Sequence, residues 1–157
     1  MRVLLKVVLD CHPDVAWDAI RSPAVLGAVS RPLTTFESLE PGGFPRLWGE
    51  GDHPVLVRAG GVVPIGEQII GISFPDLPGV RAMRDTGRGL SGPLAAITSW
   101  QHTLTVAPTD NGRTLYRDQL KFEAGALTPL LWPMYWAFWQ WRAIRMQQLA
   151  PQWSFQP

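Results

Sequence analysis

The segment from residue 127 to residue 150 constrains the fold more than any other part of the sequence. It reads LTPLLWPMYWAFWQWRAIRMQQLA. Its first half is apolar nearly all round, because the row Leu131, Tyr135 and Phe138 lies beside the main apolar stripe of the helix. We expect one long helix that packs against the rest of the protein, or against a ligand held between the two. Its main apolar stripe has the spacings of three and four that are typical of an amphipathic helix, and consists of Trp132, Trp136, Trp139, Ala143, Met146 and Ala150.

Composition limits the class of protein. A length of 157 residues suits one domain, residues 1–157, and a net charge of +1 offers no electrostatic basis for binding nucleic acid. The single cysteine, Cys11, excludes an internal disulfide and fits a reducing compartment, so we expect a cytoplasmic protein. The first ten residues have the alternating pattern of a strand, and Lys6 interrupts their apolar run. A signal peptide would have an uninterrupted apolar region here. The uncharged run 125–141 is short for a membrane span and contains two prolines, which favours a buried helix and no transmembrane segment.

The sequence contains no motif for a metal or a cofactor. His12, His53, His102 and Cys11 lack the spacing of metal ligands. The glycines of residues 87–93 precede a predicted strand, whereas a phosphate-binding loop precedes a helix. We therefore expect no metal and no cofactor, and we leave the oligomeric state open between a monomer and a homodimer.

Turn and helix signals divide the chain into an ordered series of elements. Residues 2–10 alternate as a strand. His12-Pro13 and Ser22-Pro23 each place proline at a first helical position, which predicts two short helices, the second ending near Val29. Further strands are predicted at 32–40, 54–59, 62–74, 80–86, 96–106 and 113–122. This order predicts an α+β fold, with a curved antiparallel sheet of about seven strands around the long C-terminal helix and two short helices after the first strand.

The last predicted hairpin and the two ends of the chain carry a resemblance to a known superfamily. The opening reads VLDCHPDVAWDAI, and two arginines lie late in the terminal helix. The hairpin region contributes Gly92-Pro93, Trp100-Gln101-His102, Gly112-Arg113-Thr114, Asp118, Phe122, Gly125 and Leu127. Together these residues resemble the SRPBCC or START-like helix-grip superfamily, in its polyketide cyclase/dehydrase and lipid-transport branch. The resemblance implies a cavity between a concave sheet and the terminal helix, in which members hold lipids, polyketides or aromatic molecules and a few cyclise or dehydrate them.

Strand alternation selects the side chains that would face such a cavity. Trp100 and His102 share one face of their strand, and Tyr116, Asp118 and Phe122 share one face of its partner. The leading hypothesis is that the protein binds a hydrophobic small molecule, lipid-like, polyketide or aromatic, without any catalytic residue. The predicted ligand-binding residues are Trp100, His102, Tyr116, Phe122, Trp132, Trp136 and Trp139.

Two other functions are compatible with the same residues. A cyclase or dehydratase would use His102 as its acid or base, assisted by Tyr116 or Asp118. An interaction module would dock a partner protein or a membrane surface through the start of the tryptophan-rich helix, with an exposed patch at Trp132 and Trp141.

Several of these side chains also have a purely structural interpretation. His102 can be a core histidine bonded to a neighbouring strand, and Asp118 can tie its strand to the helix or pair with an arginine. Arg142 and Arg145 suit the solvated end of a helix, where cations complement the dipole, and anion binding is the alternative for both. Trp48 is compatible both with the mouth of a cavity and with the start of a strand.

Overall fold

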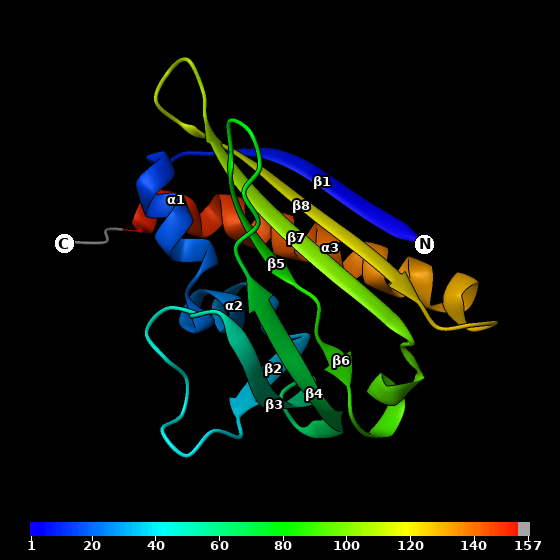
Figure 1. Cartoon of the computed structure of the whole chain (residues 1–157). Coiled ribbons are helices and arrows are strands. Elements are labelled where there is room, and N and C mark those ends of the chain that lie inside the picture. The colour runs from blue at the N-terminus through cyan, green and yellow to red at the C-terminus, as the bar shows by residue number, and fades with distance from the viewer. Residues whose placement is uncertain (154–157) are drawn as a thin grey trace.

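One antiparallel sheet and a long helix make up most of the computed structural model, which describes residues 1–153 (Figure 1). The order of helices and strands is the predicted one, with a two-residue strand, β6, and two 3₁₀ helices, η1 and η2, in addition. The elements are β1 (Arg2–Leu9), α1 (Pro13–Ile20), α2 (Pro23–Ser30), β2 (Thr34–Ser38), β3 (Gly51–Ala59), β4 (Val63–Ser73), β5 (Arg81–Asp85), β6 (Arg88–Gly89), η1 (Gly92–Ala96), β7 (Ser99–Pro108), β8 (Thr114–Glu123), α3 (Thr128–Leu149) and η2 (Ala150–Gln152).

The strands form a single sheet in the order β1-β8-β7-β5-β4-β3-β2, and β6 pairs with β4. Every pairing is antiparallel. The sheet curves, and α3 runs along one of its faces, behind β1, β8 and β7 in Figure 1. This arrangement confirms the predicted fold class.

Proline starts each of the two short helices, as predicted, and a side chain caps each of them, of which only the Ser22 cap was predicted. The His12 side chain accepts a hydrogen bond from the backbone N–H of Asp14 at the start of α1. The Ser22 hydroxyl accepts one from the backbone N–H of Val25 at the start of α2. These bonds satisfy N–H groups that the first turn of a helix leaves without an intrahelical partner.

The predicted apolar stripe of α3 is confirmed in the second half of the helix and wrong at Trp136. Trp139, Ala143 and Met146 are buried, whereas Trp136 is 47% exposed. The first half is apolar on nearly every side, so its sequence does not reveal which row faces the sheet. None of the helices in residues 1–153 is long and apolar enough to cross a membrane.

Two clusters of buried side chains form the core. The smaller cluster joins β1, β8 and α3 and includes Phe122, whose ring centroid lies 4.7 Å from that of Tyr135. The larger cluster joins the two short helices to strands β3, β4, β5, β7 and β8 and to the end of α3. Burial of apolar surface in both stabilises the fold, by about 25 cal/mol for each Å² removed from water.

Candidate functional site

A cavity of about 670 Å³ lies between the sheet and α3. Small-molecule sites in proteins typically enclose about 300–1,000 Å³. Most of the cavity wall is apolar. It includes Ile20 and Leu26 from the short helices, Val57, Ile70, Met83 and Leu104 from the sheet, and Leu131, Phe138 and Met146 from α3.

Solvent-exposed residues on the cavity wall mark its mouth. Met134 and Ala137 belong to the first half of α3, Pro93 belongs to η1, and Leu33 precedes β2. All four side chains are apolar. The rim of the cavity is therefore apolar.

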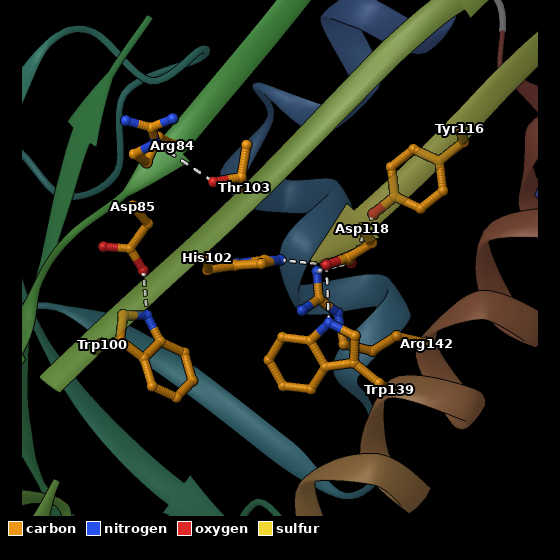
Figure 2. A network of polar contacts seen from close by, with 9 residues as sticks. All are labelled: Arg84, Asp85, Trp100, His102, Thr103, Tyr116, Asp118, Trp139 and Arg142. Atoms are coloured by element: carbon orange, nitrogen blue, oxygen red, sulfur yellow. Dashed lines mark hydrogen bonds and ion pairs between the residues drawn. The ribbon is translucent and has the colours of Figure 1, made fainter. Parts of the chain in front are cut away.

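Polar side chains from β7, β8 and α3 gather around Asp118 (Figure 2). Asp118 Oδ1 accepts hydrogen bonds from His102 Nε2 at 2.6 Å and from Trp139 Nε1 at 2.7 Å. Asp118 Oδ2 accepts one from the Tyr116 hydroxyl at 2.8 Å, and Arg142 Nη2 lies 3.7 Å from the same oxygen. All five side chains are buried.

Strand register and helix period bring this cluster together. In the β7–β8 ladder His102 is opposite Leu120 and Leu104 is opposite Asp118, so His102 and Asp118 are diagonal neighbours on one face of the sheet. Diagonal neighbours are within reach of long side chains. Trp139 and Arg142 are three residues apart on α3 and therefore share one face of the helix.

The cluster holds Asp118 ionised and Tyr116 protonated at neutral pH. Burial opposes the charge of Asp118, but the nearby His102 and Arg142 and the hydrogen bonds from His102 and Trp139 outweigh it and keep the pKa of Asp118 well below its usual range. Burial and the Asp118 charge raise the pKa of the Tyr116 hydroxyl well above its usual range. Since an ionised carboxylate only accepts hydrogen bonds, His102 Nε2 carries the proton of the 2.6 Å bond.

A second buried carboxyl, Asp85 at the end of β5, lies on the cavity wall. Its Oδ1 accepts hydrogen bonds from the backbone N–H groups of Gly71 and Gly87, both at 2.8 Å, and its Oδ2 accepts one from Trp100 Nε1 at 3.0 Å. Burial raises the pKa of Asp85, although these donors and His102 oppose the rise. A Cβ atom at Gly87 would lie 1.7 Å from the carbonyl oxygen of Ile69, so only glycine fits this close approach.

The structure divides the predicted ligand-binding residues into two groups. Trp100, His102, Tyr116 and Trp139 line the cavity. Phe122, Trp132 and Trp136 are not part of its described wall.

Packing explains why the three residues of the second group do not line the cavity. Phe122 is buried in the smaller core cluster, and Trp136 faces outward. Trp132 packs toward β1, where its indole N–H donates to the backbone carbonyl of Arg2 at 3.0 Å. The expected exposed patch at Trp132 and Trp141 is also absent from the described surface, because both are half-buried and Trp141 donates its indole N–H to the carbonyl of Arg31.

Sequence reasoning missed Arg142 and Asp85 and left the role of Trp48 open. The interpretation of Arg142 as a solvated cation is wrong, because packing of α3 on the sheet buries it. Trp48 is buried and lines the cavity. Asp85 stands two residues before a glycine, and this spacing, in which a carboxylate can accept the N–H two residues on, is the signal that could have found it.

Metal ligation has no candidate in the described part of the chain. Among residues 1–153, no group of three or more His, Cys, Asp or Glu side chains is placed to hold a metal ion. The polar groups of the cavity are instead arranged as hydrogen-bond partners of one another and of any molecule that enters.

Known structures share this arrangement of sheet and helices. A protein from Chromobacterium violaceum is 19% identical and superimposes with a TM-score of 0.66, covering 95% of this chain and 96% of that chain. Norcoclaurine synthase from Thalictrum flavum is 12% identical, with a TM-score of 0.67 and coverage of 99% and 89%. An aromatase/cyclase from Streptomyces sp. R1128 is 14% identical, with a TM-score of 0.60 and coverage of 96% and 90%.

At these identities the likeness establishes the fold alone. The chain shares with these proteins the fold of a curved antiparallel sheet around a long C-terminal helix, which is the fold that the resemblance of its sequence pattern implies. In sequence comparisons no protein-family model and no curated protein matches the chain. The cytoplasmic location, the oligomeric state and the identity of a ligand stay predictions.

Proposed function

We propose that the protein binds a hydrophobic small molecule, lipid-like, polyketide or aromatic, in the cavity between the sheet and α3. The observation that carries this proposal is a cavity of about 670 Å³ with a mainly apolar wall. Each CH₂ group of a ligand that the cavity encloses contributes about 0.8 kcal/mol to the free energy of binding. Ten such groups would contribute roughly 8 kcal/mol, against association costs of about 4 kcal/mol or more, so modest affinity is expected from apolar contacts alone.

The ligand contacts we propose are the predicted residues that line the cavity, namely Trp100, His102, Tyr116 and Trp139. Two proteins of the same fold support the use of the cavity for aromatic molecules. The norcoclaurine synthase structure contains dopamine and hydroxybenzaldehyde, and the Streptomyces protein is an aromatase/cyclase. Aromatic rings suit this wall, because Trp100, Tyr135 and Trp139 already pack edge to face with ring centroids 5.6–6.1 Å apart.

Filling the cavity should abolish this binding. Ile70→Trp combined with Leu104→Trp places two indoles in the apolar space, because both residues are buried on its wall. We expect the Kd for N-phenyl-1-naphthylamine, an uncharged probe whose fluorescence rises in apolar sites, to increase at least tenfold. Titration of the probe into wild type and variant measures this change.

Ile144→Trp is the matched control, because Ile144 is half-exposed on α3 and outside the cavity wall. It should bind the probe as wild type does. Unchanged binding by the folded double variant, verified by circular dichroism, would contradict the proposal, as would a wild-type protein that does not bind the probe.

We propose a cyclase- or dehydratase-type activity as the second candidate, because one observation favours it. His102 lines the cavity, and the 2.6 Å bond from its Nε2 to Asp118 leaves Nδ1 without a hydrogen bond within residues 1–153. A histidine held by a carboxylate through one nitrogen can exchange a proton at the other. Asp118 is then a positioning residue, and Tyr116, whose hydroxyl donates to Asp118, holds that carboxylate.

Proton exchange on a simple ketone tests this candidate. Cyclisation and dehydration of carbonyl compounds begin with removal of a proton from the carbon beside the carbonyl. If His102 Nδ1 acts as the base, wild type in D₂O should accelerate deuterium exchange at the methyl group of 2-acetylnaphthalene by about 10²–10⁴-fold, followed by NMR. His102→Ala should lose this acceleration and still bind N-phenyl-1-naphthylamine. Exchange at the buffer rate in the presence of wild type would exclude the candidate.

A further inference from the structure

Arg142 is a buried polar side chain of the cavity whose hydrogen bonding is incomplete. It lines the wall and is 6% exposed. A guanidinium has five N–H donors, yet Arg142 Nε is buried and has no hydrogen-bond partner within residues 1–153. Its other contacts are the Trp139 ring, whose centroid is 4.9 Å from Cζ, and Asp118, whose Oδ2 is 3.7 Å from Nη2. Because Nε itself is covered by protein atoms, a ligand acceptor would have to reach the Nη groups, of which Nη2 is 3.7 Å from Asp118 Oδ2.

Asp118 does not complete the hydrogen bonding of Arg142. Its Oδ1 already accepts from His102 and Trp139, and its Oδ2 accepts from Tyr116. An arginine–carboxylate fork has two parallel bonds of about 2.7–2.9 Å, whereas the Arg142–Asp118 contact is 3.7 Å. Asp118 therefore balances the charge of Arg142 and leaves most of its donors available.

The charges around the cavity favour an uncharged acceptor. Arg142 is the one Arg or Lys on the described wall, and Asp118 already opposes its charge. Asp85 adds a second carboxyl to the same wall, with its oxygens bonded to backbone N–H groups and to Trp100. A ligand carboxylate would bring a third acidic group to a wall whose one arginine already faces Asp118, and burial makes an unpaired charge unfavourable.

We propose that the ligand carries an uncharged carbonyl oxygen, as in a ketone, an aldehyde or an ester, which accepts a hydrogen bond from Arg142. This inference rests on the proposed function and narrows its ligand class. The rim residue Met134 is eight residues before Arg142 on α3, which corresponds to about 12 Å of helix. The apolar body of the ligand would extend over that length, past Phe138 and toward the mouth.

Three naphthalenes of similar shape separate the contributions of the carbonyl, the charge and the apolar body. We would measure displacement of N-phenyl-1-naphthylamine from wild type at pH 8 by 2-acetylnaphthalene, 2-ethylnaphthalene and 2-naphthoate. The ketone should compete at least tenfold better than the hydrocarbon, because a hydrogen bond to a charged donor is stronger than one between neutral groups. It should also compete better than the carboxylate.

Arg142→Met tests the donor itself, since methionine keeps an apolar stem and removes every N–H. The ketone and the hydrocarbon should then compete within about twofold of each other, while the hydrocarbon keeps its wild-type affinity. Arg145→Met is the matched control: Arg145 is on the same helix, outside the cavity wall, and donates to Gln148. It should keep the full preference for the ketone.

The outcomes distinguish this inference from the function on which it rests. Equal competition by ketone and hydrocarbon in wild type would overturn the inference and leave the binding function intact. Stronger competition by 2-naphthoate would overturn it in favour of an anionic ligand. Lack of any binding, whether of the probe or of the three compounds measured directly by calorimetry, would overturn both. The wild-type comparison decides the matter even if Arg142→Met does not fold.

Discussion

Asp118→Ala should lower the free energy of unfolding by about 3–5 kcal/mol, a large part of the roughly 5–15 kcal/mol that stabilises a domain. The substitution leaves the buried Arg142 guanidinium without a counter-charge, and it also removes the acceptor of three short hydrogen bonds. Urea unfolding followed by tryptophan fluorescence and far-UV circular dichroism measures the change. Asp52→Ala is the control: this carboxylate is exposed and 3.9 Å from Arg88, and its loss should change stability by no more than about 0.5 kcal/mol. A loss below about 1 kcal/mol for Asp118→Ala would show that the cluster does not depend on its carboxylate.

The same carboxylate makes stability depend on acid pH. The folded-state pKa of Asp118 is below the value of about 3.9 expected in an unfolded chain, so the ionised form favours folding. Its contribution is complete above about pH 5 and is lost as the pH falls through the unfolded-state pKa toward the folded one. Asp118→Asn should therefore have a flatter stability profile than wild type between about pH 5 and pH 2. Burial raises the pKa of Asp85, so this residue contributes to the pH dependence of stability with the opposite sign. It does so in both proteins, and its contribution cancels in the comparison.

Trp139→Ala should destabilise the fold by about 3–5 kcal/mol, the range for removing a buried aromatic side chain. Trp139 is 1% exposed, donates to Asp118, and packs against His102, with ring centroids 5.1 Å apart. Alanine would leave an indole-sized void beside the existing cavity and one unfilled acceptor position on Asp118. Trp136 is the same residue type one turn earlier on α3 and is 47% exposed, so Trp136→Ala should cost far less, about 0.5 kcal/mol.

Equilibrium unfolding of both tryptophan variants gives the comparison directly. A similar loss of unfolding free energy in the two variants would mean that α3 is rotated about its axis relative to the sheet, so that Trp136 is buried as well. The test is sharp because the two substitutions remove the same atoms from the same helix.

The strands of the site were predictable in detail. Period-2 alternation places Trp100 and His102, and Tyr116 and Asp118, on the faces that the structure buries. The helix residues were less predictable. Leu131, Tyr135 and Phe138 were recognised as a second row, but the tryptophan stripe was taken as the ligand-facing one, and the structure places the second row on the cavity wall.

By itself, the sequence determined the order of elements, the starts of α1 and α2, and the inward face of each long strand, because these follow from local geometry, from proline and capping residues, and from strict alternation. Only the tertiary structure decided the inner face of the first half of α3, the burial of Arg142 and the meeting of Asp118 with four partners from three elements. A helix that is apolar all round can present any side to a sheet. Which side it presents depends on packing against strands distant in the chain, and that packing sets the charge and the volume of the cavity.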